Sequence, residues 1–181
     1  MGSMIGAIFG LIYVETNAGS LPLPAPAALR VAGAAAFVGL VVLLVAFRGR
    51  PHPPADRPQA GGFGPGYWLV VTGEAVAIVA GSAILTGPLG LPGHGVVAWV
   101  SVVVGVHFLS LAAIWRMRPF CVLGAAIAAC GIAGLLAAGV AASATVIAAV
   151  GGVAPGVLLF TLAYWEALKS ASAGQGQPLR Q

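Results

Sequence analysis

The sequence contains very few charged side chains. Only 7% of its 181 residues are Asp, Glu, Lys or Arg, whereas about 25% is usual in a soluble globular domain. Hydrophobic residues make up 60% of the chain, and the mean hydropathy is +1.03. A soluble protein of this size needs many more charges to cover its surface. The composition therefore excludes a soluble domain and predicts an all-α integral membrane bundle.

Cysteine and the common catalytic motifs are also scarce or missing. Cys121 and Cys130 are nine positions apart in one apolar run, on opposite sides of the expected helix, so they cannot form a disulfide with each other. We expect both to be small buried thiols. No His/Cys cluster, phosphate-binding glycine loop, Gly-x-Ser-x-Gly or His-Glu-x-x-His occurs in the chain. The sequence therefore predicts neither a metal site nor a cofactor.

Six apolar segments are separated by turns rich in proline and glycine. About 20 residues cross a hydrocarbon layer about 30 Å thick, so the long run from 120 to 163 must be two crossings, with a turn near 139–145. The expected spans are residues 4–18, 27–47, 67–85, 96–115, 120–140 and 145–167. We expect one bundle over residues 1–168, a cytoplasmic loop at 48–66 and a disordered tail at 169–181.

Basic residues indicate the orientation of the bundle. With six spans, seven of the eight basic residues fall on one side of the membrane, and only Arg30 falls on the other. The seven are Arg48, Arg50, Arg57, Arg116, Arg118, Lys169 and Arg180. The positive-inside rule makes that side cytoplasmic and places both termini there. Because these charges are scattered at segment ends and form no patch, nucleic-acid binding is not expected.

Small residues recur every fourth position in two spans, which favours close helix packing. One ridge is formed by Gly73, Ala77 and Gly81 in the third span. A second ridge, in the fifth span, is formed by Ala126, Cys130, Gly134, Ala138 and Ala142.

Two ionisable residues lie well inside the hairpin formed by the third and fourth spans. At about 1.5 Å per residue, Glu74 lies roughly 10 Å beyond Tyr67, and His107 lies roughly 12 Å before Trp115. These depths match in an antiparallel pair. An ionisable side chain within lipid depth marks a functional site by default. If the two side chains meet, they could exchange protons near neutral pH; the alternative is a polar contact that only holds the two spans together.

A second polar group is expected at the outer turn of the first hairpin. Glu15 and Arg30 each lie about four residues inside the outer ends of their spans, which predicts an ion pair between the two helices. This pair is either structural or, with the neighbouring Asn17 and Thr16, part of a polar outer vestibule. Glu15 is also a candidate acid, and Asn17 and Arg30 are candidate substrate contacts.

The sixth span contains the segment Gly151-Gly152-Val153-Ala154-Pro155-Gly156 near its middle. Pro155 has no N–H and leaves the carbonyl of Gly151 without its helical donor, so the helix should kink or break there. Broken helices at this depth form binding sites in transporters, which makes Gly152 and Pro155 candidate substrate contacts. The alternative is an ordinary proline kink, which membrane helices tolerate.

Three segments resemble a family of small multipass membrane proteins from high-GC bacteria. They are residues 14–22 (VETNAGSLP), 66–71 (GYWLVV) and 104–109 (VGVHFL). The family's Gly-x-His-Phe element matches Gly105, His107 and Phe108, although this chain has Ser110 where the family has proline. The family is uncharacterised, so the resemblance implies a bacterial plasma-membrane protein without implying an activity.

Three functional classes remain open at this point. The first is a permease or proton-coupled carrier of a small molecule that uses Glu74 and His107. The second is a membrane-embedded enzyme acting on a lipid or isoprenoid, with Glu74 or Glu15 as acid and Trp99 or Phe108 steadying a cation. The third is an accessory protein. Membrane lipids are the expected partners, and a homo-oligomer is possible.

Overall fold

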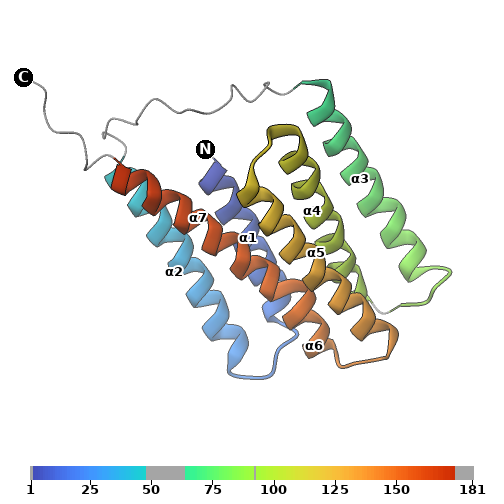
Figure 1. Cartoon of the computed structure of the whole chain (residues 1–181). Helices are drawn as coiled ribbons and strands as arrows, with labels where there is room; N and C mark the ends of the chain where they lie inside the picture. Colours follow the sequence, from blue (N-terminus) through green and yellow to red (C-terminus); the bar gives the residue numbers. More distant parts are fainter. Residues whose placement is uncertain (1, 48–63, 92, 174–181) are drawn as a thin grey trace, which may run out of the picture.

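The computed structural model describes residues 2–47, 64–91 and 93–173, and these form a bundle of helices joined by short turns (Figure 1). In chain order the helices are α1 (Gly2–Ala18), α2 (Ala25–Ala46), α3 (Pro65–Thr86), α4 (Gly93–Trp115), α5 (Arg118–Gly139), α6 (Ala144–Ala148) and α7 (Ala154–Ala173). A five-residue π-helix, η1 (Ala149–Val153), connects α6 to α7 without a break in the winding.

Five helical segments are long and apolar enough to cross a membrane. They are α2, α3, α4, α5 and the continuous segment Ala144–Ser172; α1 is also apolar but shorter. The chain is therefore a multipass helical membrane protein, and the helices lie within a few residues of the predicted spans. The tail predicted from residue 169 begins as helix, because α7 continues to Ala173. Residues 48–63 of the predicted loop and residues 174–181 lie outside the described residues.

Prolines mark where three of the helices begin. Pro26, Pro65 and Pro119 each occupy the first or second position of α2, α3 and α5. A proline is favourable there because its missing N–H would have no partner in the first turn and its φ is already helical. The turn between α5 and α6 ends at Ser143, whose hydroxyl caps α6 by accepting from the Val146 N–H.

The core lies between α1, α4, α5 and α7, with α2 and α3 on opposite flanks (Figure 1). The most extensive contact is between α4 and α5, and the next is between α1 and α7. α3 packs mainly against α4, and no residue of α3 is fully buried within the bundle. Most of its surface therefore faces outward, toward lipid or another chain.

Glycines allow α4 and α5 to approach closely. A Cβ added at Gly105 would lie 2.7 Å from the Ala128 Cα, and one at Gly131 would lie 2.5 Å from the Val102 N. Real Cβ atoms are not found so close to another backbone, so both positions require glycine in this arrangement. Gly134 belongs to the same contact, against Ala98 of α4.

Two packing predictions need correction. The ridge predicted on the third span is only partly used: Trp99 covers Gly81, but nothing lies within 4 Å of a Cβ built at Gly73. Of the two cysteines, Cys130 is half-buried and Cys121 is exposed, so the burial predicted for Cys121 was wrong. Both differences arise because apolar residues in a membrane helix also occupy the outward face, where no neighbouring helix packs.

Candidate functional site

The hairpin of α3 and α4 brings Glu74 and His107 into contact. The Glu74 Oε2 lies 2.9 Å from the His107 Nδ1, and the two side chains are only 22% and 16% exposed. The distance is within the range of a hydrogen bond, but His107 Nδ1 forms no hydrogen bond. The matched depths in the sequence left open whether the two side chains meet, and the structure brings them into contact. Protonation of either group changes the charge at this position.

The His107 ring contacts one end of a series of aromatic rings. The Phe108 ring meets the His107 ring edge to face, with 5.7 Å between centroids, and it also contacts Phe120. Phe120 in turn meets Trp115 edge to face. Phe108, predicted as a substrate contact, therefore packs directly against the His107 imidazole.

Trp99, another predicted substrate contact, ties α4 to α3. Its indole N–H donates to the Ala77 carbonyl over 2.9 Å, and its ring lies directly over Gly81. The structure therefore uses Trp99 to fix the position of α3. This contact lies about two turns from His107 along α4 and helps to hold Glu74 in place.

At the predicted interruption of the last span the helix does not break: it passes through the π-turn η1 and continues as α7. The π-helix is a single turn, Ala149–Val153, that includes Gly151 and Gly152, and it ends two residues before Pro155, which is fully buried. The carbonyl of Gly151, which Pro155 leaves without a donor, accepts a hydrogen bond from the Ser101 hydroxyl over 2.5 Å. π-helical turns inside α-helices are frequent at functional sites.

Ser101 and Tyr13 were not singled out from the sequence. Ser101 is fully buried in the middle of α4, and its Oγ lies 3.3 Å from the hydroxyl of the buried Tyr13. A serine hydroxyl has one proton, and a carbonyl can only accept, so Ser101 donates to Gly151 and Tyr13 donates to Ser101. The sequence held one indication of this contact: Pro155 leaves the Gly151 carbonyl without its usual helical donor, so a donor from another helix, such as Ser101, could be expected.

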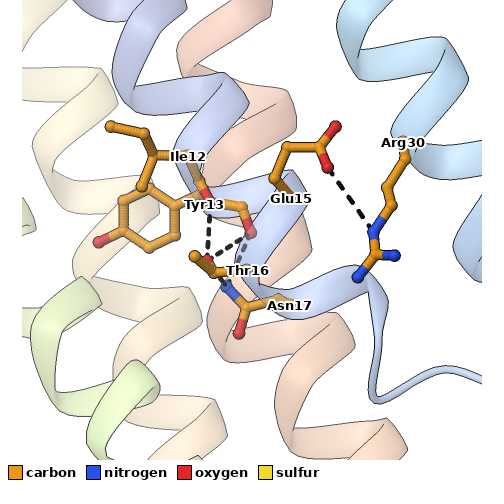
Figure 2. Close-up of polar contacts among 6 residues, drawn as sticks. All are labelled: Ile12, Tyr13, Glu15, Thr16, Asn17 and Arg30. Atoms are coloured by element: carbon orange, nitrogen blue, oxygen red, sulfur yellow. Dashed lines mark hydrogen bonds and ion pairs between the residues drawn. The ribbon is translucent and has the colours of Figure 1, made fainter.

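Asn17 lies against η1 from the α1 side, and Figure 2 shows it beside Tyr13 and Thr16 of its own helix. Its side-chain amide donates to the Tyr13 carbonyl over 2.7 Å and lies 3.2 Å from the Thr16 hydroxyl. A Cβ at Gly152 would collide with the Asn17 side chain, so the glycine allows this approach. The structure therefore brings Asn17 and Gly152 together in the core, as parts of a polar cluster with Tyr13, Ser101 and Gly151.

The predicted ion pair of Glu15 and Arg30 is present between α1 and α2 (Figure 2). The Glu15 Oε2 lies 3.6 Å from the Arg30 Nε, with the two side chains 39% and 52% exposed. Nearby, the Thr145 hydroxyl donates to the Ser20 carbonyl and joins the end of α1 to the start of α6. The ion pair lies apart from the buried polar cluster, at the outer turn.

Replacing Arg30 by glutamine should lower the free energy of unfolding by less than about 1 kcal/mol, because the pair is long and half-exposed. The melting temperature of purified protein should fall by no more than about 4 °C. Glu15→Gln should have a similar effect, and the double variant should be no worse than either single one. Loss of the folded protein in Arg30→Gln alone would show that the pair is essential to the fold.

Two further features bear on the chemistry of the site. Among the described residues, no three His, Cys, Asp or Glu side chains lie close enough together to hold a metal ion. A shallow, open depression on α3 is lined by Ala75, Val76, Val79 and Ala80 and includes neither Glu74 nor His107.

Comparisons with protein-family models, with curated proteins and with solved structures find no match for this chain. The function is therefore argued from the site itself.

Proposed function

We propose that the protein is a small proton-coupled carrier in which Glu74 and His107 hold and release the proton. The observation that carries this proposal is their 2.9 Å contact, mostly buried, in the middle of two membrane-length helices. Ionisable side chains are costly at this depth and are typical of proton relays in pumps and transporters. Imidazole is the side chain best suited to change its charge near neutral pH.

The proposed topology has six spans, with α1 as the first, and both termini in the cytoplasm of a bacterial cell. In the bundle, the starts of α1, α3 and α5 and the ends of α4 and α7 lie on one side (Figure 1). Arg116, Arg118 and Lys169 are exposed on this side, whereas Arg30 is near the other. Tyr67 and Trp115 stack there with 6.4 Å between ring centroids. Basic residues and aromatic rings at one end favour a cytoplasmic interface.

The π-turn η1 supplies the second part of the proposed carrier. At η1 the chain departs from α-helical hydrogen bonding, and Asn17 and Ser101 bring polar atoms to it. A small solute that hydrogen-bonds to such groups would bind next to a helix that can change its winding. Proton transfer to the Glu74–His107 pair would then change the relative stability of the two access states, which is how a proton gradient drives a carrier.

The enzyme alternative has less support. An acid acting on a lipid or isoprenoid needs an apolar pocket open to the membrane, with the acid at its end. The depression on α3 is apolar and open, but neither Glu74 nor Glu15 lines it.

Proton-coupled uptake can be tested before the solute is known. Purified protein in liposomes containing a pH-sensitive dye would be exposed to fractions of a bacterial metabolite extract. A fraction that the parent transports should acidify the lumen, and Glu74→Gln should reduce this signal by on the order of tenfold or more, because the amide cannot release a proton. His107→Gln should behave in the same way.

Glu166→Gln is the matched control, since it neutralises a carboxylate near the end of α7 and should leave proton flux unchanged. Melting temperatures of all variants distinguish lost transport from lost folding. If Glu74→Gln and His107→Gln transport as well as the parent, or only melt earlier, the pair is a structural contact and the proposal is wrong.

A further inference from the structure

We propose that Glu15 and Arg30 form a binding site for a small zwitterionic molecule, one that carries an ammonium group close to a carboxylate or phosphate. Arg30 binds the oxyanion and Glu15 binds the ammonium group. The site lies at the outer turn between α1 and α2, apart from the Glu74–His107 pair. It goes beyond the proposed function, and only the statement that this molecule is the carried solute rests on that function.

The position of Arg30 is the first observation that points to a ligand. In the proposed topology it is the one Lys or Arg of the sequence on the outer side, and it lies within the apolar helix α2. A charged side chain inside a membrane helix is costly and usually has a function. The ion pair offsets little of this cost, because it is long and its side chains are 39% and 52% exposed.

The guanidinium group of Arg30 keeps its two terminal nitrogens out of the ion pair. The contact with Glu15 is made by Nε at 3.6 Å, which is beyond hydrogen-bond range. Figure 2 shows the two Nη atoms on the far side of the guanidinium from Glu15. Within the described part of the chain, Arg30 has no second ion pair and no hydrogen bond. Its parallel N–H groups fit the two oxygens of a carboxylate or phosphate.

Gly19 leaves this guanidinium group open. A Cβ built at Gly19 would lie 3.5 Å from the Arg30 Nη2, which is an ordinary contact distance. Gly19 is exposed and its φ is not in the left-handed region, so the turn itself does not require glycine. A side chain at this position would cover one of the Nη atoms. The glycine therefore keeps the anion-binding side of Arg30 accessible.

The helices that carry the pair are held in a fixed relation. A Cβ built at Gly33 of α2 would lie only 3.2 Å from a side chain of α1, so the two helices approach closely one turn from Arg30. The Thr145 hydroxyl donates to the Ser20 carbonyl over 2.9 Å and fastens the turn after α1 to the start of α6. The site therefore needs little reorganisation when it binds, which favours affinity.

The charges of the pair select a zwitterion over a simple ion. The carboxylate of Glu15 lies beside the guanidinium group of Arg30, so the two formal charges balance. An anion that is attracted by Arg30 is repelled by Glu15, and a cation meets the reverse. A molecule that carries both groups satisfies both residues, and this difference is the basis of its selection.

The proposed function gives this site a place in transport. Asn17 follows Glu15 by two positions on α1, and its side chain lies against Gly152 of η1. A molecule bound by the outer pair is therefore next to the segment where the proposed carrier binds its solute. Because a zwitterion has no net charge, its uptake against a gradient needs a coupled ion, which is the proton of the Glu74–His107 pair.

Binding can be measured by saturation-transfer NMR on full-length protein in nanodiscs of phosphatidylglycerol, a lipid without an ammonium group. The probes are the standard amino acids, one at a time, and phosphoethanolamine, which is the headgroup of a zwitterionic lipid. Acetate and methylammonium represent the two halves. At least one zwitterion should bind about tenfold more tightly than either half, since it adds a second charge-assisted contact. Binding of an amino acid identifies a solute, and binding of phosphoethanolamine alone identifies a lipid headgroup.

Three variants test the assignment of the two residues. Arg30→Gln should weaken zwitterion binding by about tenfold or more, with the small change in melting temperature expected above. Gly19→Asp should weaken it similarly, because a carboxylate beside Nη2 occupies the guanidinium group without altering it. Glu15→Gln should weaken zwitterion binding but strengthen acetate binding, since it removes the repulsion. A purely structural ion pair would not produce this opposite change.

Arg118→Gln is the matched control, because it removes another exposed guanidinium group, at the start of α5 on the opposite side of the bundle. It should leave binding unchanged. If acetate binds the parent as tightly as every zwitterion, or if Arg30→Gln and Gly19→Asp bind like the parent, the site is wrong. Binding that needs Arg30, without Glu74-dependent proton flux in liposomes, would retain the site and reject the carrier. Glu74-dependent flux without zwitterion binding would retain the carrier and reject the site.

Discussion

Replacing Gly105 by alanine is expected to lower the free energy of unfolding by about 3 kcal/mol or more, which is at the upper end for overpacking. The new Cβ would lie 2.7 Å from the Ala128 Cα, and it would also collide with the Ala128 backbone nitrogen. A backbone cannot move aside as a flexible side chain can, so α4 and α5 must separate. Because this is the most extensive contact in the bundle, the separation would disturb the whole core. The measurement is the melting temperature and the yield of monodisperse protein after extraction.

Gly73→Ala is the matched control for this change. Gly73 is also inside a membrane-length helix, but no atom lies within 4 Å of its built Cβ. The substitution should leave stability unchanged or raise it by up to about 1 kcal/mol through helix propensity. Equal losses in the two variants would show that alanine is harmful in either helix for a reason other than the α4–α5 contact.

Replacing Ser101 by alanine is expected to have the second largest effect on stability. The variant leaves the Gly151 carbonyl without its donor from α4 and the Tyr13 hydroxyl without its acceptor. Each unpaired polar group in a buried place costs about 1–3 kcal/mol. The loss should appear as a lower melting temperature and as faster amide exchange in residues 149–156.

Ser110→Ala is the control for Ser101→Ala. It also removes a serine hydroxyl from α4, but not a hydrogen bond between helices. Ser110 donates to the Val106 carbonyl of its own helix, and that carbonyl remains part of the helical ladder. Removing this bond should cost less than about 0.5 kcal/mol, as is usual away from special contacts. If Ser101→Ala were as mild as Ser110→Ala, the Gly151 carbonyl would have another donor and the support of η1 by Ser101 would be refuted.

Several features followed from the order of residues alone. Membrane insertion follows from composition, since the transfer free energy of an apolar segment depends on its length and residues and hardly on its neighbours. The equal depth of Glu74 and His107 in one hairpin followed from residue number, because helix rise converts residue number directly into distance, whereas their contact came from the structure. The departure from regular α-helix at η1 followed from Pro155, whose missing N–H acts on its own helix. Each of these arguments uses local geometry.

Only the tertiary structure decided which faces of the helices are buried. In a soluble helix the apolar stripe marks the core, but here residues that face lipid are as apolar as residues that face another helix. Gly73 was therefore predicted to pack closely and Gly105 and Gly131 were not, although of the three only Gly105 and Gly131 have a neighbouring backbone within reach. Tyr13 and Ser101 became part of the site for the same reason: their contact joins α1 to α4 over 88 positions of sequence. Such a pairing depends on how the helices are rotated and packed, and that is determined by the sum of many contacts across the bundle.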